Sequence, residues 1–281
     1  MTKGKVSIKK YSNLPGFNMS IGFTIFYVSI LLLIPLSTIF FNSLNISFKE
    51  FIEIVTNERV IKSYKISFGT AFIAAIINMI FGLVIAWIIV RYKFLGNKFI
   101  DAIIDIPFAL PTAVAGIALT SIYGPNGIIG KFFINMRIKI AFTPIGIIIA
   151  LIFIGLPFVV RTVQPVLESL DRECEEAALS LGASKFITFI KVIFPELIPS
   201  LITGFTLAFA RGLGEYGSVV FIAGNIPMKT EITPLLIRSK LEQYDYNGAT
   251  AIALVLLISS FIILFSMNIL QWINKRKKIA W

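Results

Sequence analysis

Long runs of apolar residues alternate with short polar segments along the whole chain. A helix needs about 20 mostly apolar residues to cross the hydrocarbon core of a bilayer, and several runs reach that length. The pattern therefore predicts an all-α integral membrane protein with six transmembrane helices. The six predicted spans cover roughly residues 20–41, 66–90, 100–122, 141–162, 196–223 and 248–272.

The segments between these runs are short, so we expect no separate soluble domain. One transmembrane domain is expected over residues 20–272, after an N-terminal tail over 1–19 and before a basic C-terminal tail over 273–281. The first run is too long for a signal peptide and lacks an A-x-A cleavage pattern. We therefore interpret it as a membrane anchor.

Composition supports a membrane protein and narrows its chemistry. Of the 281 residues, 57% are hydrophobic and 15% are charged, whereas soluble domains carry roughly 25% charged residues. A single cysteine, Cys174, excludes an intrachain disulfide. The sequence has no histidine, which excludes zinc motifs of the H-E-x-x-H type and His-based catalytic triads. An integral-membrane enzyme is therefore not favoured.

The basic residues indicate how the chain is oriented. The net charge of +11 does not indicate nucleic-acid binding, because many Lys and Arg residues flank the apolar runs. They are more numerous on the side that holds both tails, residues 91–99 and residues 161–195. Cytoplasmic loops carry the excess of Lys and Arg. We therefore expect the chain in the plasma or inner membrane of a bacterial cell, with both termini in the cytoplasm.

A patterned, partly charged segment over residues 163–195 separates the fourth and fifth predicted spans. Apolar residues recur at helical spacing over 166–181, with polar residues between them. Gly182 stands where a helix would end, Ser184 can cap a following short helix, and Pro195 is expected to stop it. The sequence predicts a helix–glycine–helix elbow on the cytoplasmic face. A linker that lies against its own bundle is an equal alternative on the pattern alone.

The spacing within this elbow resembles a known signature. In EEAALSLGASKFITFIKVIFP (175–195), E-A-A begins at position 176, the glycine follows after three residues, and V-I-F-P follows after nine more. This resembles the E-A-A-x₃-G-x₉-I-x-L-P motif of permease subunits of ATP-binding-cassette (ABC) importers, with Val and Phe replacing Ile and Leu. In that family the elbow, called the coupling helix, docks into a cleft of a cytosolic ATPase. The resemblance assigns this coupling role to Glu176, Ala177, Ala178, Gly182, Val192 and Pro195.

Three further strings extend the resemblance over about residues 60–270. RYKFLGNKFIDAIIDIPFALPTAVAGIAL (91–119), YGPNGIIG (123–130) and FARGLGEYGSVVFIAGNIPMKTEITPLLI (209–237) are similar to the T-type (CysT-like) subunit of sulfate/thiosulfate permeases. The resemblance implies a type I ABC importer permease fold and a translocation path for sulfate or thiosulfate. Molybdate permeases are related, so molybdate or tungstate is the alternative substrate.

The same resemblance implies several partner chains. They are a second, W-type permease subunit, two copies of a cytosolic ATPase that binds ATP and Mg, and an external sulfate-binding protein. This chain contains no G-x-x-x-x-G-K-[ST] phosphate loop, so we expect no cofactor and no ATPase site of its own. A channel or a secondary anion transporter would explain the six spans but not the elbow.

Two ionisable residues lie inside the fifth predicted span. Arg211 and Glu215 are four residues apart, so on a helix they share one face and can pair. Charges inside a membrane are costly and usually face the bundle interior or a water-filled path. The pair is either a bridge that fixes helix packing or the lining of an anion path or gate. Asp101 and Asp105 are expected at the membrane interface or paired with Lys98.

Overall fold

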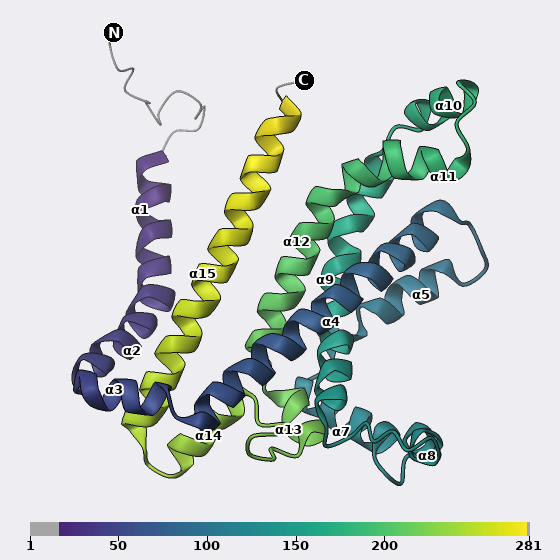
Figure 1. Ribbon diagram of the computed structural model, residues 1–281. Coiled ribbons are helices and arrows are strands. Elements are labelled where there is room, and N and C mark those ends of the chain that lie inside the picture. Colours follow the sequence, from purple (N-terminus) through teal and green to yellow (C-terminus); the bar gives the residue numbers. More distant parts are fainter. Residues whose placement is uncertain (1–16, 280–281) are drawn as a thin grey trace.

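Long helices run between the two ends of the molecule, and short helices gather at each end (Figure 1). The computed structural model describes residues 17–279, and this part of the chain contains no strand. The helical elements are α1 Phe17–Val28, the π-helical η2 Ser29–Leu33, α2 Ile34–Leu44, α3 Phe48–Val55, α4 Glu58–Arg91, α5 Asn97–Ile104, α6 Ile106–Ala109, α7 Thr112–Tyr123, α8 Ile128–Asn135, α9 Pro144–Ser169, α10 Arg172–Ser180, α11 Lys185–Thr188, the π-helical η3 Phe189–Ile193, α12 Phe194–Leu213, α13 Gly217–Ala223, α14 Thr233–Glu242 and α15 Tyr246–Ile279.

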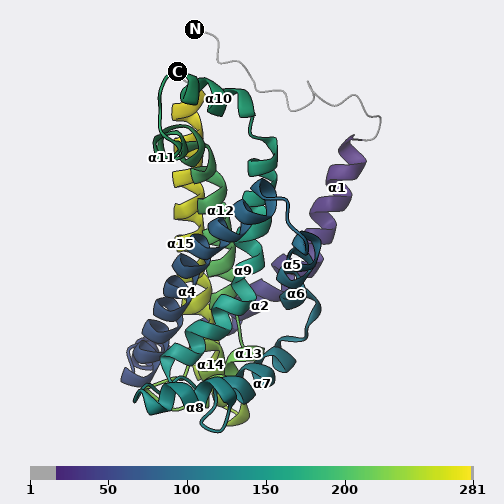
Figure 2. The same ribbon diagram turned by 90° about the vertical axis from the view of Figure 1, so that its right-hand side faces the viewer.

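Different helices lie at the two ends of the molecule. The beginning of α1 and the end of α15 lie at the same end as α10 and α11, and α8 and α14 lie at the opposite end (Figures 1 and 2). An even number of membrane crossings between α1 and α15 accounts for this arrangement. Of the tail predicted over residues 1–19, residues 1–16 lie outside the described part of the chain. The rest belongs to α1, which begins at Phe17. The residues predicted as a C-terminal tail continue α15 as far as Ile279.

Each of the six predicted spans corresponds to helical structure. The span predicted over 100–122 is a pair of helical stretches, Asn97–Ala109 and Thr112–Tyr123, that meet at an angle of 112°. The other five are long apolar helical stretches, so the predicted all-α membrane fold is confirmed. These five stretches are Met19–Leu44, Glu58–Arg91, Pro144–Ser169, Lys185–Leu213 and Tyr246–Ile269.

The bend in the third span has a local cause. Leu110 ends α6 with extended backbone angles, φ −80° and ψ 133°, and Pro111 directly precedes α7. The proline ring disfavours the helical conformation for the residue before it. The continuous span expected over 100–122 is therefore wrong in shape, although the apolar run itself is present.

The fifth predicted span, 196–223, is also corrected at both ends. Its helical stretch begins at Lys185 and ends at Leu213. Gly214 caps α12, and a separate short helix, α13, begins at Gly217. Glycine lowers helix stability because it loses more backbone freedom on folding than other residues. The two glycines therefore mark the place where the apolar run stops being one helix.

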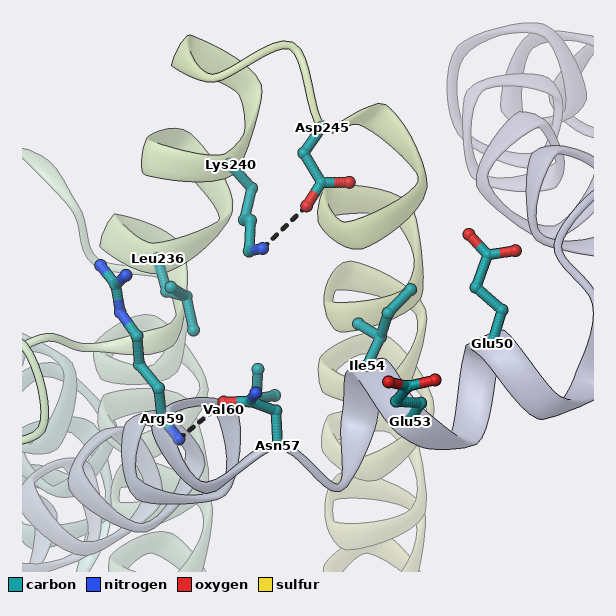
Figure 3. Close-up of a pocket in the computed structure, with 9 residues that line it drawn as sticks. All are labelled: Glu50, Glu53, Ile54, Asn57, Arg59, Val60, Leu236, Lys240 and Asp245. Atoms are coloured by element: carbon teal, nitrogen blue, oxygen red, sulfur yellow. Dashed lines mark hydrogen bonds and ion pairs between the residues drawn. The ribbon is translucent and has the colours of Figure 1, made fainter.

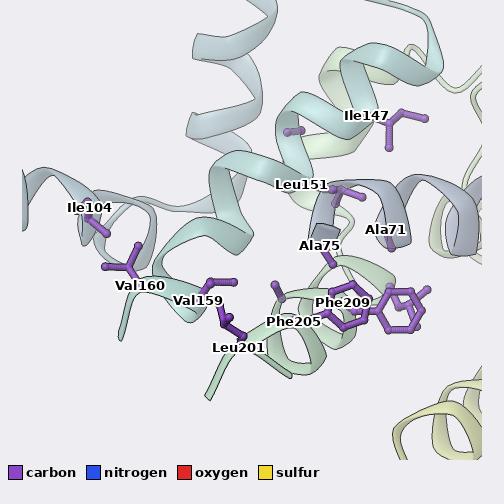
Figure 4. Close-up of a cluster of buried hydrophobic side chains, with 14 of the residues drawn as sticks. Ala71, Ala75, Ile104, Ile147, Leu151, Val159, Val160, Leu201, Phe205 and Phe209 are labelled. Atoms are coloured by element: carbon purple, nitrogen blue, oxygen red, sulfur yellow. The ribbon is translucent and has the colours of Figure 1, made fainter. Parts of the chain in front are cut away.

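Helices α4, α9 and α12 pack together at the centre of the structure, around a cluster of buried apolar side chains (Figure 4). Buried positions of α4 recur every three or four residues, and most of them carry small side chains. Small residues let helices approach closely in a membrane, where lipid removes the hydrophobic driving force. A Cβ atom at Gly82 of α4 would lie 2.8 Å from Val159 Cβ, and one at Gly204 of α12 would lie 2.9 Å from Val159 Cα. Val159 of α9 is thus held between α4 and α12.

The short helices α7 and α13 also meet at a glycine. A Cβ atom at Gly116 of α7 would lie 2.5 Å from the carbonyl oxygen of Ser218 and 2.8 Å from its Cα. Both obstructing atoms belong to the backbone of α13, so a side-chain rotation cannot relieve the clash. Gly116 therefore fixes how closely α7 and α13 approach each other.

We expect Gly116→Ala to destabilise the folded protein, because overpacking a tight contact costs about 1–3 kcal/mol. The measurement is the melting temperature of the purified protein in detergent. Gly69→Ala is the matched control, because a Cβ at Gly69 of α4 meets nothing within 4 Å and alanine favours helix by up to about 1 kcal/mol over glycine. Equal melting temperatures for the two variants would contradict the close contact at Gly116.

Candidate functional site

The predicted elbow is present at one end of the molecule, where α10, α11 and η3 form it (Figure 1). The Asp171 side chain accepts a hydrogen bond of 3.0 Å from the backbone N–H of Glu173 and starts α10. Gly182 follows α10 with φ +84°, in the left-handed region that glycine adopts at little cost. Ser184 Oγ accepts a hydrogen bond of 3.3 Å from the Ile187 N–H and starts α11. The predicted glycine turn and serine cap are therefore confirmed.

Two details of the elbow differ from the prediction. The helical pattern over 166–181 belongs to two helices, because Leu170 has extended backbone angles and ends α9. Pro195 does not stop a helix, since the helical stretch continues from Lys185 to Leu213. Its ring lies in the first turn of α12, directly after the π-helical η3. Proline is tolerated in a first turn, where no helical hydrogen bond from its nitrogen is needed.

The outer surface of the elbow is apolar, and the other described residues do not cover it. Leu181 is 89% exposed and Phe186 is 72% exposed. Exposed apolar patches of this kind mark protein or membrane contacts. We call this surface the elbow patch, and its residues are Leu179, Leu181, Phe186, Ile187 and Ile190.

The structure separates the predicted coupling residues into two groups. Glu176, Ala177 and Gly182 are exposed, and Ala178 is partly buried beside them. Val192 is partly buried and lines a pocket of about 460 Å³ inside the elbow, between α10 and η3. The first group can meet a partner directly. The second group, which also includes the partly buried Pro195, lies in the helix behind that surface.

The predicted Arg211–Glu215 pair exists, with a different geometry from the expected one. Arg211 Nη1 lies 2.5 Å from Glu215 Oε2, although α12 ends at Leu213 and Glu215 follows it. The other carboxylate oxygen accepts hydrogen bonds from the Ser218 N–H at 2.9 Å and the Ser218 hydroxyl at 3.0 Å. Glu215 is 1% exposed and caps α13, whereas the Arg211 side chain is 35% exposed. The ion pair is therefore present, and part of the Arg211 side chain remains accessible.

A second ion-pair cluster was missed by sequence reasoning. Arg161 of α9 donates from Nε and Nη2 to the two carboxylate oxygens of Asp105, at 2.9 and 2.7 Å. Its Nη1 donates to Asp101 Oδ1 at 2.6 Å. The expected pairing of these aspartates with Lys98 is therefore replaced by pairing with Arg161. The cluster attaches α5 to α9 and holds the first half of the bent span against the central helices.

A third missed ion pair joins the elbow to the end of α4. Glu175 of α10 pairs with Arg91, the last residue of α4. These residues are 84 positions apart in the chain. From the sequence alone, Glu175 is one of several acidic residues at the polar positions of α10. No local spacing rule connects it to Arg91.

The opposite end of the molecule is fixed by polar contacts. Glu231 is 1% exposed, and its two carboxylate oxygens accept hydrogen bonds of 2.7 Å from Nε and Nη2 of Arg59. Ser67 Oγ accepts a hydrogen bond of 2.7 Å from the Thr233 N–H at the start of α14. These contacts hold the loop between α13 and α14 against α4.

A pocket of about 500 Å³ at this end is lined by α3, α4, α14 and the start of α15 (Figure 3). Lys240 Nζ lies 2.7 Å from Asp245 Oδ2, and the Gly248 N–H donates to Asp245 Oδ1 at 2.8 Å. The hydrogen bond from Lys240 holds the pKa of Asp245 below its ordinary value. Glu50 and Glu53 add further carboxylates to the pocket wall. The three carboxylates of the lining outnumber its two cations, Arg59 and Lys240, so the pocket offers no net positive charge to an anion. Asp245 serves to start α15.

Comparison with known proteins identifies the family. Residues 78–279 match the family described as "Binding-protein-dependent transport system inner membrane component". The chain is 48% identical to the sulfate transport system permease protein CysT of Escherichia coli (strain K12), over 92% of this chain and 93% of that protein. It is 47% identical to the CysT protein of Synechocystis sp. (strain ATCC 27184 / PCC 6803 / Kazusa), over 90% of this chain and 88% of that protein.

Solved structures show the same fold. A bacterial ABC transporter involved in the import of the acidic polysaccharide alginate matches with a TM-score of 0.74 at 15% identity, over 90% of this chain and 94% of that chain. The alginate transporter in complex with a pentasaccharide-bound periplasmic protein matches with a TM-score of 0.73 at 17% identity, over 89% and 92%. The arrangement of helices is thus the type I ABC importer permease fold that the sequence predicted. The chain is a multi-pass membrane protein and belongs to the binding-protein-dependent transport system inner membrane component family.

Proposed function

We propose that the chain is a membrane-spanning permease subunit of an ATP-driven importer of sulfate and thiosulfate. The relatives named as sulfate permeases support this substrate, since they are 47–48% identical over at least 90% of the chain. The subunit forms part of the translocation path and has no ATPase site of its own. Molybdate and tungstate are the competing substrates that a transport assay must exclude.

The elbow patch is the observation that carries the coupling to ATP. It is a large exposed apolar surface at the end of the molecule where α1 begins and α15 ends. Lys185 of α11 and Lys191 of η3 belong to the elbow, and Arg91 pairs with α10; these basic residues support a cytoplasmic location. A cleft in a cytosolic ATPase would cover the patch, with Glu176, Ala177 and Gly182 in the contact.

The remaining parts of the proposed importer are separate chains. They are a W-type permease subunit, two copies of the ATPase that hold ATP and Mg, and an external sulfate-binding protein that delivers the anion. The chain lies in the plasma or inner membrane of a bacterial cell, with both termini in the cytoplasm. Bacterial relatives support this location.

Arg211 is our candidate for a residue of the anion path. Glu215 uses both carboxylate oxygens inside the chain, to Arg211 and to Ser218, so we assign it a packing role. The Arg211 side chain keeps an exposed face next to the break between α12 and α13. A half-neutralised guanidinium can attract a dianion without holding it tightly, because the partner carboxylate reduces the local positive charge.

Introducing a charge into the elbow patch should strongly reduce transport. We expect Leu181→Glu to reduce sulfate uptake at least about tenfold and to prevent co-purification of the ATPase, because central apolar contacts dominate interface energies. Leu95→Glu is the matched control, since Leu95 is a fully exposed leucine in the loop between α4 and α5. Normal uptake and normal co-purification for Leu181→Glu would contradict the docking surface.

The substrate is tested in cells that lack this subunit. We expect the chain to restore uptake of radiolabelled sulfate, and unlabelled thiosulfate to compete with it. Restoration of molybdate uptake without sulfate uptake would assign the chain to the competing substrates. The external binding protein must be present in both assays, because it delivers the anion.

The two roles of Arg211 can be separated by neutralising one or both members of the pair. Arg211→Gln leaves the buried Glu215 without its partner, which should lower the melting temperature, because an unpaired buried charge is costly. Arg211→Gln together with Glu215→Gln removes both charges and should recover most of that stability. If Arg211 lines the path, sulfate uptake stays low in the double variant. Normal uptake there would leave Arg211 with the packing role alone.

A further inference from the structure

Arg91 connects the end of α4 to the elbow. Its Nη2 pairs with Oε1 of Glu175 on α10, and the two side chains are only 12% and 21% exposed. The Arg91 Nε atom is buried and has no hydrogen-bond partner. Because both groups are largely removed from water, their attraction is screened less than that of an exposed ion pair.

The Arg91 contact continues into the helix that follows the elbow. Its guanidinium carbon lies 5.3 Å from the centroid of the Trp87 ring, one turn earlier in α4. Trp87 makes an edge-on contact with Phe189 of η3, with 5.3 Å between ring centroids. The ring centroid of Phe189 in turn lies 6.0 Å from the ring centroid of Phe194, the first residue of α12. Cation–π and edge-on aromatic contacts are both attractive, so α10, α4 and α12 are joined by one continuous set of side chains.

The end of α4 is itself held in place. The Asn97 side-chain amide donates to the carbonyl oxygens of Ile89 at 2.8 Å and of Tyr92 at 3.0 Å. Carbonyls at the last turn of a helix have no partner within the helix, and Asn97 supplies one. Fraying at Arg91 is therefore opposed, and a force on its side chain acts on the whole of α4.

Chain connectivity shows why such a link is needed. The elbow is joined by the backbone to α9 at Leu170 and to α12 through η3. Helix α4 has no backbone connection to the elbow, yet it packs extensively against both α9 and α12. A side-chain link is thus required for the elbow to act on α4 directly.

We propose that Arg91 is a positioning residue for energy coupling, which ties α10 to α4 through Glu175 and to α12 through Trp87. The inference rests on the proposed docking of the ATPase on the elbow. When the ATPase displaces α10, the Arg91 link makes α4 move together with α9 and α12. Without the link, the displacement is partly absorbed between α10 and α4, and ATP is hydrolysed with less transport.

The test measures sulfate transported per ATP hydrolysed by the complete importer in proteoliposomes, with the external binding protein present. We expect Arg91→Glu and Glu175→Arg each to lower this ratio at least about fivefold, the lower end of typical coupling effects. The double variant restores the opposite charges in exchanged positions and should recover at least about half of the ratio. Lys62→Glu is the control, because Lys62 pairs with Glu58 at the other, exposed end of α4.

A milder variant protects the test against failure to assemble. Glu175→Gln keeps the size of the side chain and a hydrogen-bond acceptor but removes the charge, and we expect it to lower the ratio in an intact complex. An unchanged ratio in Glu175→Gln, or a double variant no better than either single variant, overturns the proposal. A purely structural pair would lower the melting temperature and leave the ratio unchanged. Absence of an ATPase from the purified wild-type complex would instead refute the proposed function.

Discussion

The close approach of α4, α9 and α12 is the constraint on which the rest of the structure depends. In a bilayer, apolar side chains gain little by leaving lipid for protein, so helix association needs close packing. Gly82 of α4 and Gly204 of α12 allow it, because neither has a side chain that would collide with Val159 of α9. A larger side chain at either glycine would push these helices apart. The elbow, the bent third span and α13 all connect to them or pack against them.

Ion pairs then attach the irregular segments to this central group. Arg161 holds α5, and Arg59 holds the loop before α14. Glu215 holds the start of α13. Ion pairs add little net stability, whether exposed or buried, but each requires one arrangement of its partners. Their contribution here is to fix the positions of the short segments that they join to the central helices.

The sequence predicted those features that depend on local chemistry. Hydropathy located all six spans, and Gly182 and Ser184 marked the elbow because a left-handed turn and a helix cap each require particular side chains. The break at Leu110 was missed because the residues on both sides are apolar and leave the hydropathy unchanged. Arg211 and Glu215 were paired correctly because they are four residues apart. The partners of Arg161 and Arg91 are 56 to 84 residues away, and only the three-dimensional packing brings them together.

These features together attach the elbow to all three central helices. Its two backbone connections and the Arg91 link give each of the three central helices its own attachment to one rigid surface. Val159 packs closely against both glycines, so the three helices lie in direct contact. In the proposed importer, a displacement at the elbow would reach the central helices as a group, because they pack together, whereas Glu231 and Asp245 make ion pairs at the opposite end. If the ATPase drives the elbow as proposed, the break between α12 and α13 lies along the chain between the driven elbow and the held Glu231, and Arg211 is exposed at that break.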